Sequence, residues 1–211
     1  ASVAKELIEN SIDAGCNRLD IDIINGGKDK IRVKDNGSGI NNEEIKLAFS
    51  RYATSKINNI NDLYSLKTLG FRGEALASIA SVSKVEITSK SKEDSRGKRL
   101  VIKGSEILES HSTASTVGTD ITVTELFYNT PARFKYMKTT NTEFGHISDI
   151  TCNEALAYPE IKFNLTHNKN QILKTPGSGD LKDCIYSIYG SELTDNLIEI
   201  NFEDKYIQVE G

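Results

Sequence analysis

Three polar side chains recur at helical spacing near the start of the chain. Glu6, Asn10 and Asp13 are three or four residues apart, so they share a narrow stripe of a helix, opposite Leu7 and Ile8. Such a stripe is typical of the solvated face of an amphipathic helix. It also permits chemistry, because a carboxylate can polarise a water while an amide oxygen one turn away ligates Mg²⁺. The residues leave both interpretations open.

A second polar cluster, Asp35-Asn36-Gly37-Ser38-Gly39, follows a segment of alternating apolar and polar residues. Its composition is that of an ordinary turn. The alternative is the floor of a cavity, where glycine lets a flat ring approach the backbone. A carboxylate at a strand end could there accept a hydrogen bond from an exocyclic amine, such as N6 of adenine.

A third cluster, Gly70-Phe71-Arg72-Gly73-Glu74, runs directly into an apolar helical segment. The free N–H groups and the dipole at a helix start favour an anion such as phosphate. A plain loop before a helix is the competing interpretation. The pattern G-x-x-x-x-G-K-[ST] occurs nowhere, which excludes a P-loop nucleotide site.

Composition limits the class of protein. The 211 residues include 26 Lys and Arg against 30 Asp and Glu, a net charge of −4, which disfavours a general nucleic-acid-coating protein but permits a local basic patch. Apolar residues make up 37%, as in globular proteins, and no run approaches the roughly 18 residues of a membrane span. The three cysteines are too far apart for a disulfide framework or a zinc motif. These features predict a soluble, intracellular, reduced protein with no membrane partner.

Periodicity predicts an α+β fold with one mostly antiparallel sheet. The helices are expected at 3–14, 42–49, 74–82, from a capping box at 140–143 to just before Pro159, and at 180–189. The strands are expected at 19–23, 30–34, 84–90, 98–103, 106–111, 119–126, 161–166, 170–174, 197–202 and 205–210. The segment 50–72 is expected to be a long functional loop, and the helix after it to be buried on nearly every side.

Taken together, five motifs identify a resemblance. In chain order they are Glu6–Ala14, Asp35–Gly39, Arg51–Lys56, Gly70–Leu76 and Phe127–Arg133. This order resembles the N-terminal ATPase region of bacterial-type MutL DNA mismatch repair proteins, members of the GHKL superfamily with gyrase B, HSP90 and histidine kinases. The resemblance implies a Bergerat α/β sandwich, a mostly antiparallel mixed sheet with helices on one face. It also implies a GHKL domain over 1–190 that lacks the family's N-terminal segment, and the truncated start of a second, S5-like transducer domain at 191–211.

The resemblance assigns roles by position. Glu6 would be the general base that activates water, Asn10 would ligate Mg²⁺, and Asp35 would bind adenine N6. Gly39 would let the base approach, and Thr119 would lie near adenine through water. The other nucleotide contacts implied are Asp13, Ser55 and Lys56, with a lid and phosphate cradle formed by Gly70, Phe71, Arg72, Gly73, Glu74, Ala75 and Leu76. The resemblance also implies that a lysine of the following domain, outside this chain, would contact the γ-phosphate.

The function implied is a slow, Mg²⁺-dependent ATPase that works as a switch. ATP would order the lid and dimerise two N-terminal regions, coupling mismatch recognition to downstream repair in the cytoplasm. The implied partners are a MutS-type mismatch recognition protein, downstream repair factors, weakly bound DNA, and a second copy in the full protein. Two alternatives stay open: a nucleotide-binding module without turnover, and another GHKL member of the gyrase B type.

Overall fold

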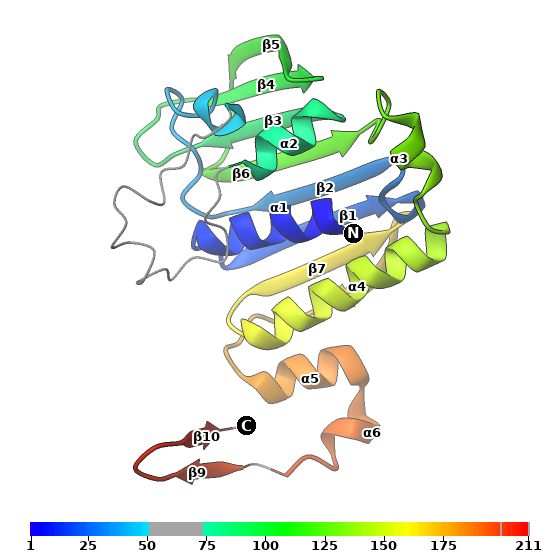
Figure 1. Cartoon of the computed structure of the whole chain (residues 1–211). Coiled ribbons are helices and arrows are strands. Elements are labelled where there is room, and N and C mark those ends of the chain that lie inside the picture. Colours follow the sequence, from blue (N-terminus) through cyan, green and yellow to red (C-terminus); the bar gives the residue numbers. More distant parts are fainter. Residues whose placement is uncertain (51–73, 199, 211) are drawn as a thin grey trace.

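The computed structural model describes residues 1–50, 74–198 and 200–210, and it contains an eight-stranded mixed sheet with helices against one face (Figure 1). The strand order is β5-β4-β3-β6-β2-β1-β7-β8, and every neighbouring pair is antiparallel except β1 with β7. The strands are β1 (Arg18–Ile24), β2 (Lys30–Asp35), β3 (Lys84–Lys90), β4 (Gly97–Lys103), β5 (Glu106–Thr113), β6 (Gly118–Thr124), β7 (Lys162–His167) and β8 (Asn170–Lys174). The expected α+β fold and its mostly antiparallel sheet are confirmed.

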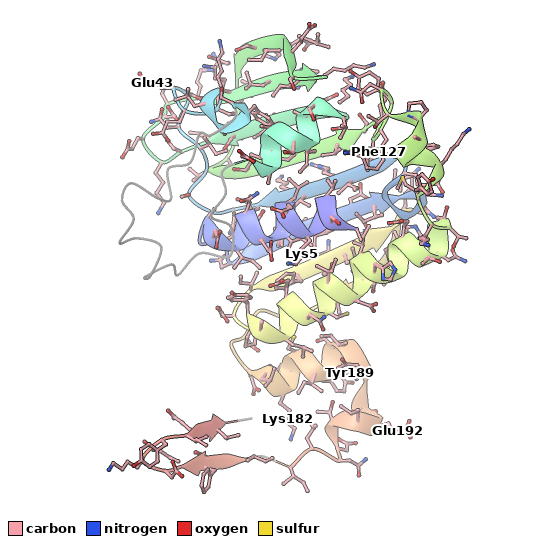
Figure 2. All side chains as sticks on the ribbon, in the orientation of Figure 1. Lys5, Glu43, Phe127, Lys182, Tyr189 and Glu192 are labelled. Atoms are coloured by element: carbon pink, nitrogen blue, oxygen red, sulfur yellow. The ribbon has the colours of Figure 1, made fainter. Side chains whose placement is uncertain are left out.

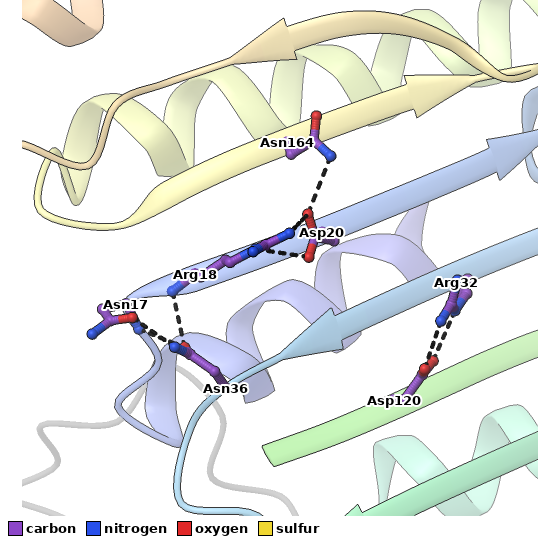
Figure 3. Close-up of polar contacts among 7 residues, drawn as sticks. All are labelled: Asn17, Arg18, Asp20, Arg32, Asn36, Asp120 and Asn164. Atoms are coloured by element: carbon purple, nitrogen blue, oxygen red, sulfur yellow. Dashed lines mark hydrogen bonds and ion pairs between the residues drawn. The ribbon is translucent and has the colours of Figure 1, made fainter. Parts of the chain in front are cut away.

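Alternation along the strands gives the sheet one apolar and one polar face. In β1, Leu19, Ile21 and Ile23 are buried, whereas the intervening Asp20 and Asp22 are half-exposed. Figure 3 shows the polar face, where Arg18 and Asn164 bind Asp20 and where Arg32 forms a two-pronged ion pair with Asp120 across β2 and β6. The apolar face therefore needs a cover of helices, and the polar face needs none.

Three helices supply most of that cover: α1 (Ser2–Asp13), α2 (Ala75–Ser81) and α4 (Thr140–Ala157) (Figure 1). Helix α1 buries Ala4, Leu7 and Ile8 against the sheet, where they join the main core. The remaining short elements are η1 (Asn25–Gly27), η2 (Leu47–Phe49), α3 (Pro131–Lys135), α5 (Leu181–Tyr189) and α6 (Ser191–Thr194).

Three local expectations were wrong. Residues 42–46 are turns followed by the single 3-10 turn η2, so no helix spans 42–49. Helix α4 is capped by Thr139, one residue before the expected position, and the Glu143 carboxylate accepts from the backbone N–H of Lys138 at 3.0 Å. Helix α2 is not buried all round, because Ser78 on it is exposed. Apart from Ser50, the expected loop at 50–72 lies outside the described residues.

A small hairpin ends the described chain. Strands β9 (Asn201–Glu203) and β10 (Gln208–Glu210) pair with each other and, among the described residues, with no strand of the large sheet. Across residues 1–50, 74–198 and 200–210, no helix is long and apolar enough to cross a membrane. Cys16 and Cys184 are buried, Cys152 is half-buried, and all three are free thiols, as expected.

Candidate functional site

The end of helix α1 meets the loop that follows β2. The backbone N–H of Ser38 donates to the carbonyl of Ala14 at 2.9 Å. A Cβ at Gly37 would lie only 2.7 Å from the same carbonyl oxygen, so this close approach requires glycine. The contact sets the C-terminal end of α1 beside the Asp35–Gly39 loop, although strand β1 and most of β2 separate the two motifs in the sequence.

Asp35 is the centre of this junction. It ends β2 with only 8% of its surface exposed. Its Oδ1 accepts from the backbone N–H groups of Gly37 (2.9 Å) and Thr119 (3.2 Å), and its Oδ2 lies 3.1 Å from the hydroxyl of Ser11. A carboxylate offers about four acceptor positions, so within the described part of the chain Oδ2 keeps one for a further donor.

Burial dominates the electrostatics of Asp35. Desolvation raises the pKa of its carboxyl above the usual range, although hydrogen bonds from Gly37, Ser11 and Thr119 oppose the shift. Burial, with the nearby charge of Asp35, also raises the pKa of the Cys16 thiol to about 12. A donor that binds Oδ2 would therefore meet a poorly hydrated carboxylate, where a hydrogen bond is stronger than in water.

The loop after Asp35 is fastened to the sheet. Gly39 has φ +71°, and a Cβ there would overlap the carbonyl oxygen of Lys90 at the end of β3. The backbone N–H of Ile40 donates to Ser89 Oγ at 2.8 Å, and Lys98 Nζ binds the carbonyl of Asn42 at 2.8 Å. The glycine therefore has a packing reason at this position, and the loop has a fixed backbone.

The α1 stripe is only partly engaged within the described part of the chain. Glu6, Asn10 and Asp13 are all half-buried. No hydrogen bond joins the side chain of Glu6 or Asn10 to another described residue, whereas Asp13 does have an interaction. Their shared partial exposure agrees with the prediction that Glu6, Asn10 and Asp13 lie on one side of α1.

Sequence reasoning missed three residues in and around this cluster: Ser11, Ser89 and Glu9. Ser11 has a buried hydroxyl that contacts Asp35, and Ser89 has a buried hydroxyl that accepts from the backbone N–H of Ile40, in the loop after Asp35. Glu9 is buried on α1, where its carboxylate forms an ion pair with Lys5 at 2.9 Å, and Lys5 is labelled on that helix in Figure 2. Ser11 lies among the buried positions of α1, so its periodicity could have indicated a buried polar group. No local pattern marks the other two.

The lid residues are described only in part. Glu74 is the N-cap of α2, and it is half-buried, as are Ala75 and Leu76. The other expected nucleotide contacts lie outside the described residues, namely Ser55, Lys56, Gly70, Phe71, Arg72 and Gly73.

The fifth motif of the resemblance, Phe127–Arg133, lies away from the Asp35 junction. It follows the end of β6 that pairs with the start of β2, because Thr124 lies opposite Lys30. Asp35 is at the other end of β2. Figure 2 accordingly shows Phe127 toward one end of the strands and Glu43, which belongs to the loop beyond Asp35, toward the other end.

The donor set can be tested against Mg²⁺. Among the described residues no group of three or more His, Cys, Asp or Glu could hold a metal by itself. Mg²⁺ needs no such cage, since it commonly keeps several waters and takes one or two protein oxygens with substrate phosphates. The amide of Asn10, which binds no other side chain or backbone group of the described residues, fits that arrangement.

Comparison with known proteins identifies the family of the chain. Residues 1–126 match the model of the family described as histidine kinase-, DNA gyrase B-, and HSP90-like ATPase. The chain belongs to this ATPase family. Over all 211 residues it is 59% identical to the DNA mismatch repair protein MutL of Halothermothrix orenii, and 49% identical to that of Bacillus cereus strain AH820. It covers 33% and 32% of these proteins, so it spans about a third of their length.

Solved structures of DNA repair proteins have a similar fold. The Aquifex aeolicus MutL ATPase domain complexed with ADP is 31% identical, with a TM-score of 0.75, and the match covers 89% of this chain and 67% of that one. The N-terminal domain of a DNA repair protein superposes with a TM-score of 0.81 at 26% identity, over 100% of this chain and 66% of that one. The MutL-type resemblance and the GHKL fold expected from the motifs are confirmed.

Proposed function

We propose that this chain binds ATP with Mg²⁺ and hydrolyses it slowly, as the N-terminal ATPase region of a DNA mismatch repair protein. The observation that carries the proposal is Asp35, a buried carboxylate at the C-terminal end of α1 whose Oδ2 binds only Ser11 among the described residues and so keeps an acceptor position. An adenine amino group is the matching donor. The solved ADP complex of a MutL ATPase domain supports this choice of ligand.

The residues divide into a base-binding and a phosphate-binding set. Asp35, Gly39 and Thr119 would bind adenine, and Asn10 would hold Mg²⁺ against the phosphates. Mg²⁺, when bound, neutralises phosphate charge. Glu6, four positions from Asn10, would accept the proton of the attacking water. Asp13 and the segments containing Ser55, Lys56 and Gly70–Leu76 would complete the phosphate cradle and lid.

The proposed cycle is conformational. ATP would order the lid and bring two N-terminal regions together in the full protein, and hydrolysis would reset them. The partners would be a MutS-type mismatch recognition protein, downstream repair factors and weakly bound DNA. Residues 191–211 would begin the second domain, which the separate pairing of β9 with β10 supports. A cytoplasmic location fits these partners.

Calorimetric titration tests the proposal. ADP, or a non-hydrolysable ATP analogue, should bind the wild-type protein saturably, and Asp35→Ala should abolish the binding while the protein stays folded. Equal binding by Asp35→Ala would contradict the proposed base site. A nucleotide-binding module without turnover remains the competing function, and single-turnover hydrolysis by the full protein, lost in Glu6→Ala, excludes it.

A further inference from the structure

Ser89 is a fully buried hydroxyl at the edge of the proposed base site. It lies near the end of β3, opposite Thr119 of β6 in the sheet register, and its exposed fraction is 0%. Its Oγ lies 2.8 Å from the backbone N of Ile40, 3.1 Å from the carbonyl oxygen of Gly118 and 2.9 Å from Thr119 Oγ1. One side chain thus joins the loop after Asp35 to the start of β6.

The positions of the hydrogens follow from counting donors. A serine hydroxyl has one hydrogen to donate and two lone pairs that accept. The N–H of Ile40 can only donate, and the carbonyl of Gly118 can only accept. If Ser89 donates to Gly118, the hydroxyl of Thr119 donates to Ser89 and all three contacts are hydrogen bonds. If Ser89 donates to Thr119 instead, the Gly118 contact is lost, so the first arrangement is favoured in a buried site.

This arrangement fixes what Thr119 offers to a ligand. Its hydroxyl hydrogen is held by Ser89, so its oxygen keeps only lone pairs, which accept. Its backbone N–H is also occupied, because it donates to Asp35 Oδ1. The position on Asp35 Oδ2 that no other described residue fills is an acceptor as well. The Asp35–Thr119 edge of the site therefore accepts hydrogen bonds and donates none.

We propose that Ser89 is a positioning residue that makes this site selective for a purine with an amino group at position 6. It does so by holding the Thr119 hydroxyl as an acceptor. A carbonyl oxygen at position 6, as in guanine, would face acceptors on both residues and leave them without a donor, which is costly in a buried site. The inference rests on the proposed function and deepens it.

The test compares ADP with GDP in the wild-type protein and in Ser89→Ala. Loss of the hydroxyl frees Thr119 to rotate and donate, so the ratio of ADP to GDP affinity should fall roughly tenfold, the size expected for one hydrogen bond. Ser83→Ala is the matched control. Ser83 is equally buried but directly precedes β3, at the strand end away from Ser89, and its hydroxyl donates to the carbonyl of Ile79 in α2. The control variant should leave the ratio unchanged.

A double-mutant cycle separates positioning from a merely structural role. Thr119→Val should lower the ADP to GDP ratio, and Ser89→Ala added to it should lower the ratio no further, because Ser89 acts through Thr119. An unchanged ratio in Ser89→Ala, or an equal loss of both nucleotides, would overturn the inference. If thermal denaturation shows Ser89→Ala to be unfolded, Ser89→Cys replaces it: its weakly bonding thiol should also lower the ratio, and an unchanged ratio overturns the inference.

Failure of the proposed function has a different signature. A wild-type protein that binds neither ADP nor ATP would overturn both statements together. A wild-type protein that binds ADP, loses it in Asp35→Ala and keeps its full selectivity in Ser89→Ala would overturn the role of Ser89 alone.

Discussion

The hydroxyl of Ser11 lies 3.1 Å from Asp35 Oδ2, which joins helix α1 to the end of strand β2. The same hydroxyl lies 3.0 Å from the carbonyl of Leu7, one turn back along the helix. With a single hydrogen, it can donate to only one of these acceptors at a time. Ser11 can thus bind the position-35 side chain either as donor or, while donating to Leu7, as acceptor. A side chain at position 35 that donates to Ser11, in place of one that accepts from it, would therefore keep this hydrogen bond.

Asp35→Asn should separate binding from stability. The amide oxygen can keep the bonds from Gly37 and Thr119, and its NH₂ can donate to Ser11. The NH₂ replaces the acceptor that adenine needs, so ADP affinity should fall roughly 10- to 100-fold. Calorimetry measures the affinity, and circular dichroism should show an unchanged fold. Retained affinity would contradict the role of Asp35.

The same substitution should change how stability depends on pH. The folded-state pKa of Asp35 is raised, so its contribution to stability is full below the unfolded value of about 3.9 and is lost as pH rises through the folded pKa. Relative to the wild type, Asp35→Asn should therefore become more stable as pH increases from about 4, and level off above the folded pKa. Urea denaturation across pH measures the difference, and a difference that shrinks with rising pH would contradict the desolvation of Asp35.

Glu6→Gln should abolish turnover while sparing nucleotide binding. The amide keeps the size of the side chain but cannot accept a proton, and a general base contributes about 10²- to 10⁴-fold in rate. Single-turnover hydrolysis in the full protein measures the loss, with ADP titration as the measure of binding. Glu106→Gln, an exposed position on edge strand β5, is the control and should hydrolyse ATP at the wild-type rate. Equal rates in Glu6→Gln and wild type would refute the assignment.

Asn10→Ala should remove the effect of Mg²⁺. If the amide oxygen holds the ion against the phosphates, Mg²⁺ strengthens ADP binding in the wild-type protein and not in the variant. Titrations with Mg²⁺ and with EDTA measure this dependence. Asn153→Ala, at an exposed position of α4, should behave as wild type. A loss of affinity that is the same in EDTA would instead indicate a role for Asn10 in shaping the pocket.

The sequence predicted what depends on local periodicity and missed what depends on packing between elements. Alternation located the strands to within about two residues except in the final hairpin, because a strand with one buried face must alternate. Glu9 was missed because its burial depends on the fold: α1 packs against β2 and α4, and no sequence window on α1 contains those elements. The Thr139 cap was misplaced by one residue because three threonines lie within four positions, and propensity does not choose between them.

The candidate site shows the same division. Motifs predicted Asp35 and Asn10 as site residues, whereas Ser89 stands in a strand without any motif and acquires its contact with Thr119 only through the β3–β6 register. Gly39 was expected to admit the adenine ring, and its packing against Lys90 adds a requirement that turn composition does not reveal. Side chains that hold other side chains therefore need the fold before they can be recognised.

Gly39→Ala should weaken both folding and nucleotide binding. The residue has φ +71°, and the added Cβ would overlap the Lys90 carbonyl oxygen, so the loop must move away from β3. Strain of this kind costs of order 1–3 kcal/mol, and the displaced loop carries Ile40 off Ser89. Gly145→Ala is the matched control, because it lies in helix α4 with open space around the added Cβ and should stabilise the protein by roughly 0.5–1 kcal/mol. Urea denaturation and ADP titration measure both effects, and a Gly39→Ala protein as stable as the wild type would show that the loop is free of the sheet.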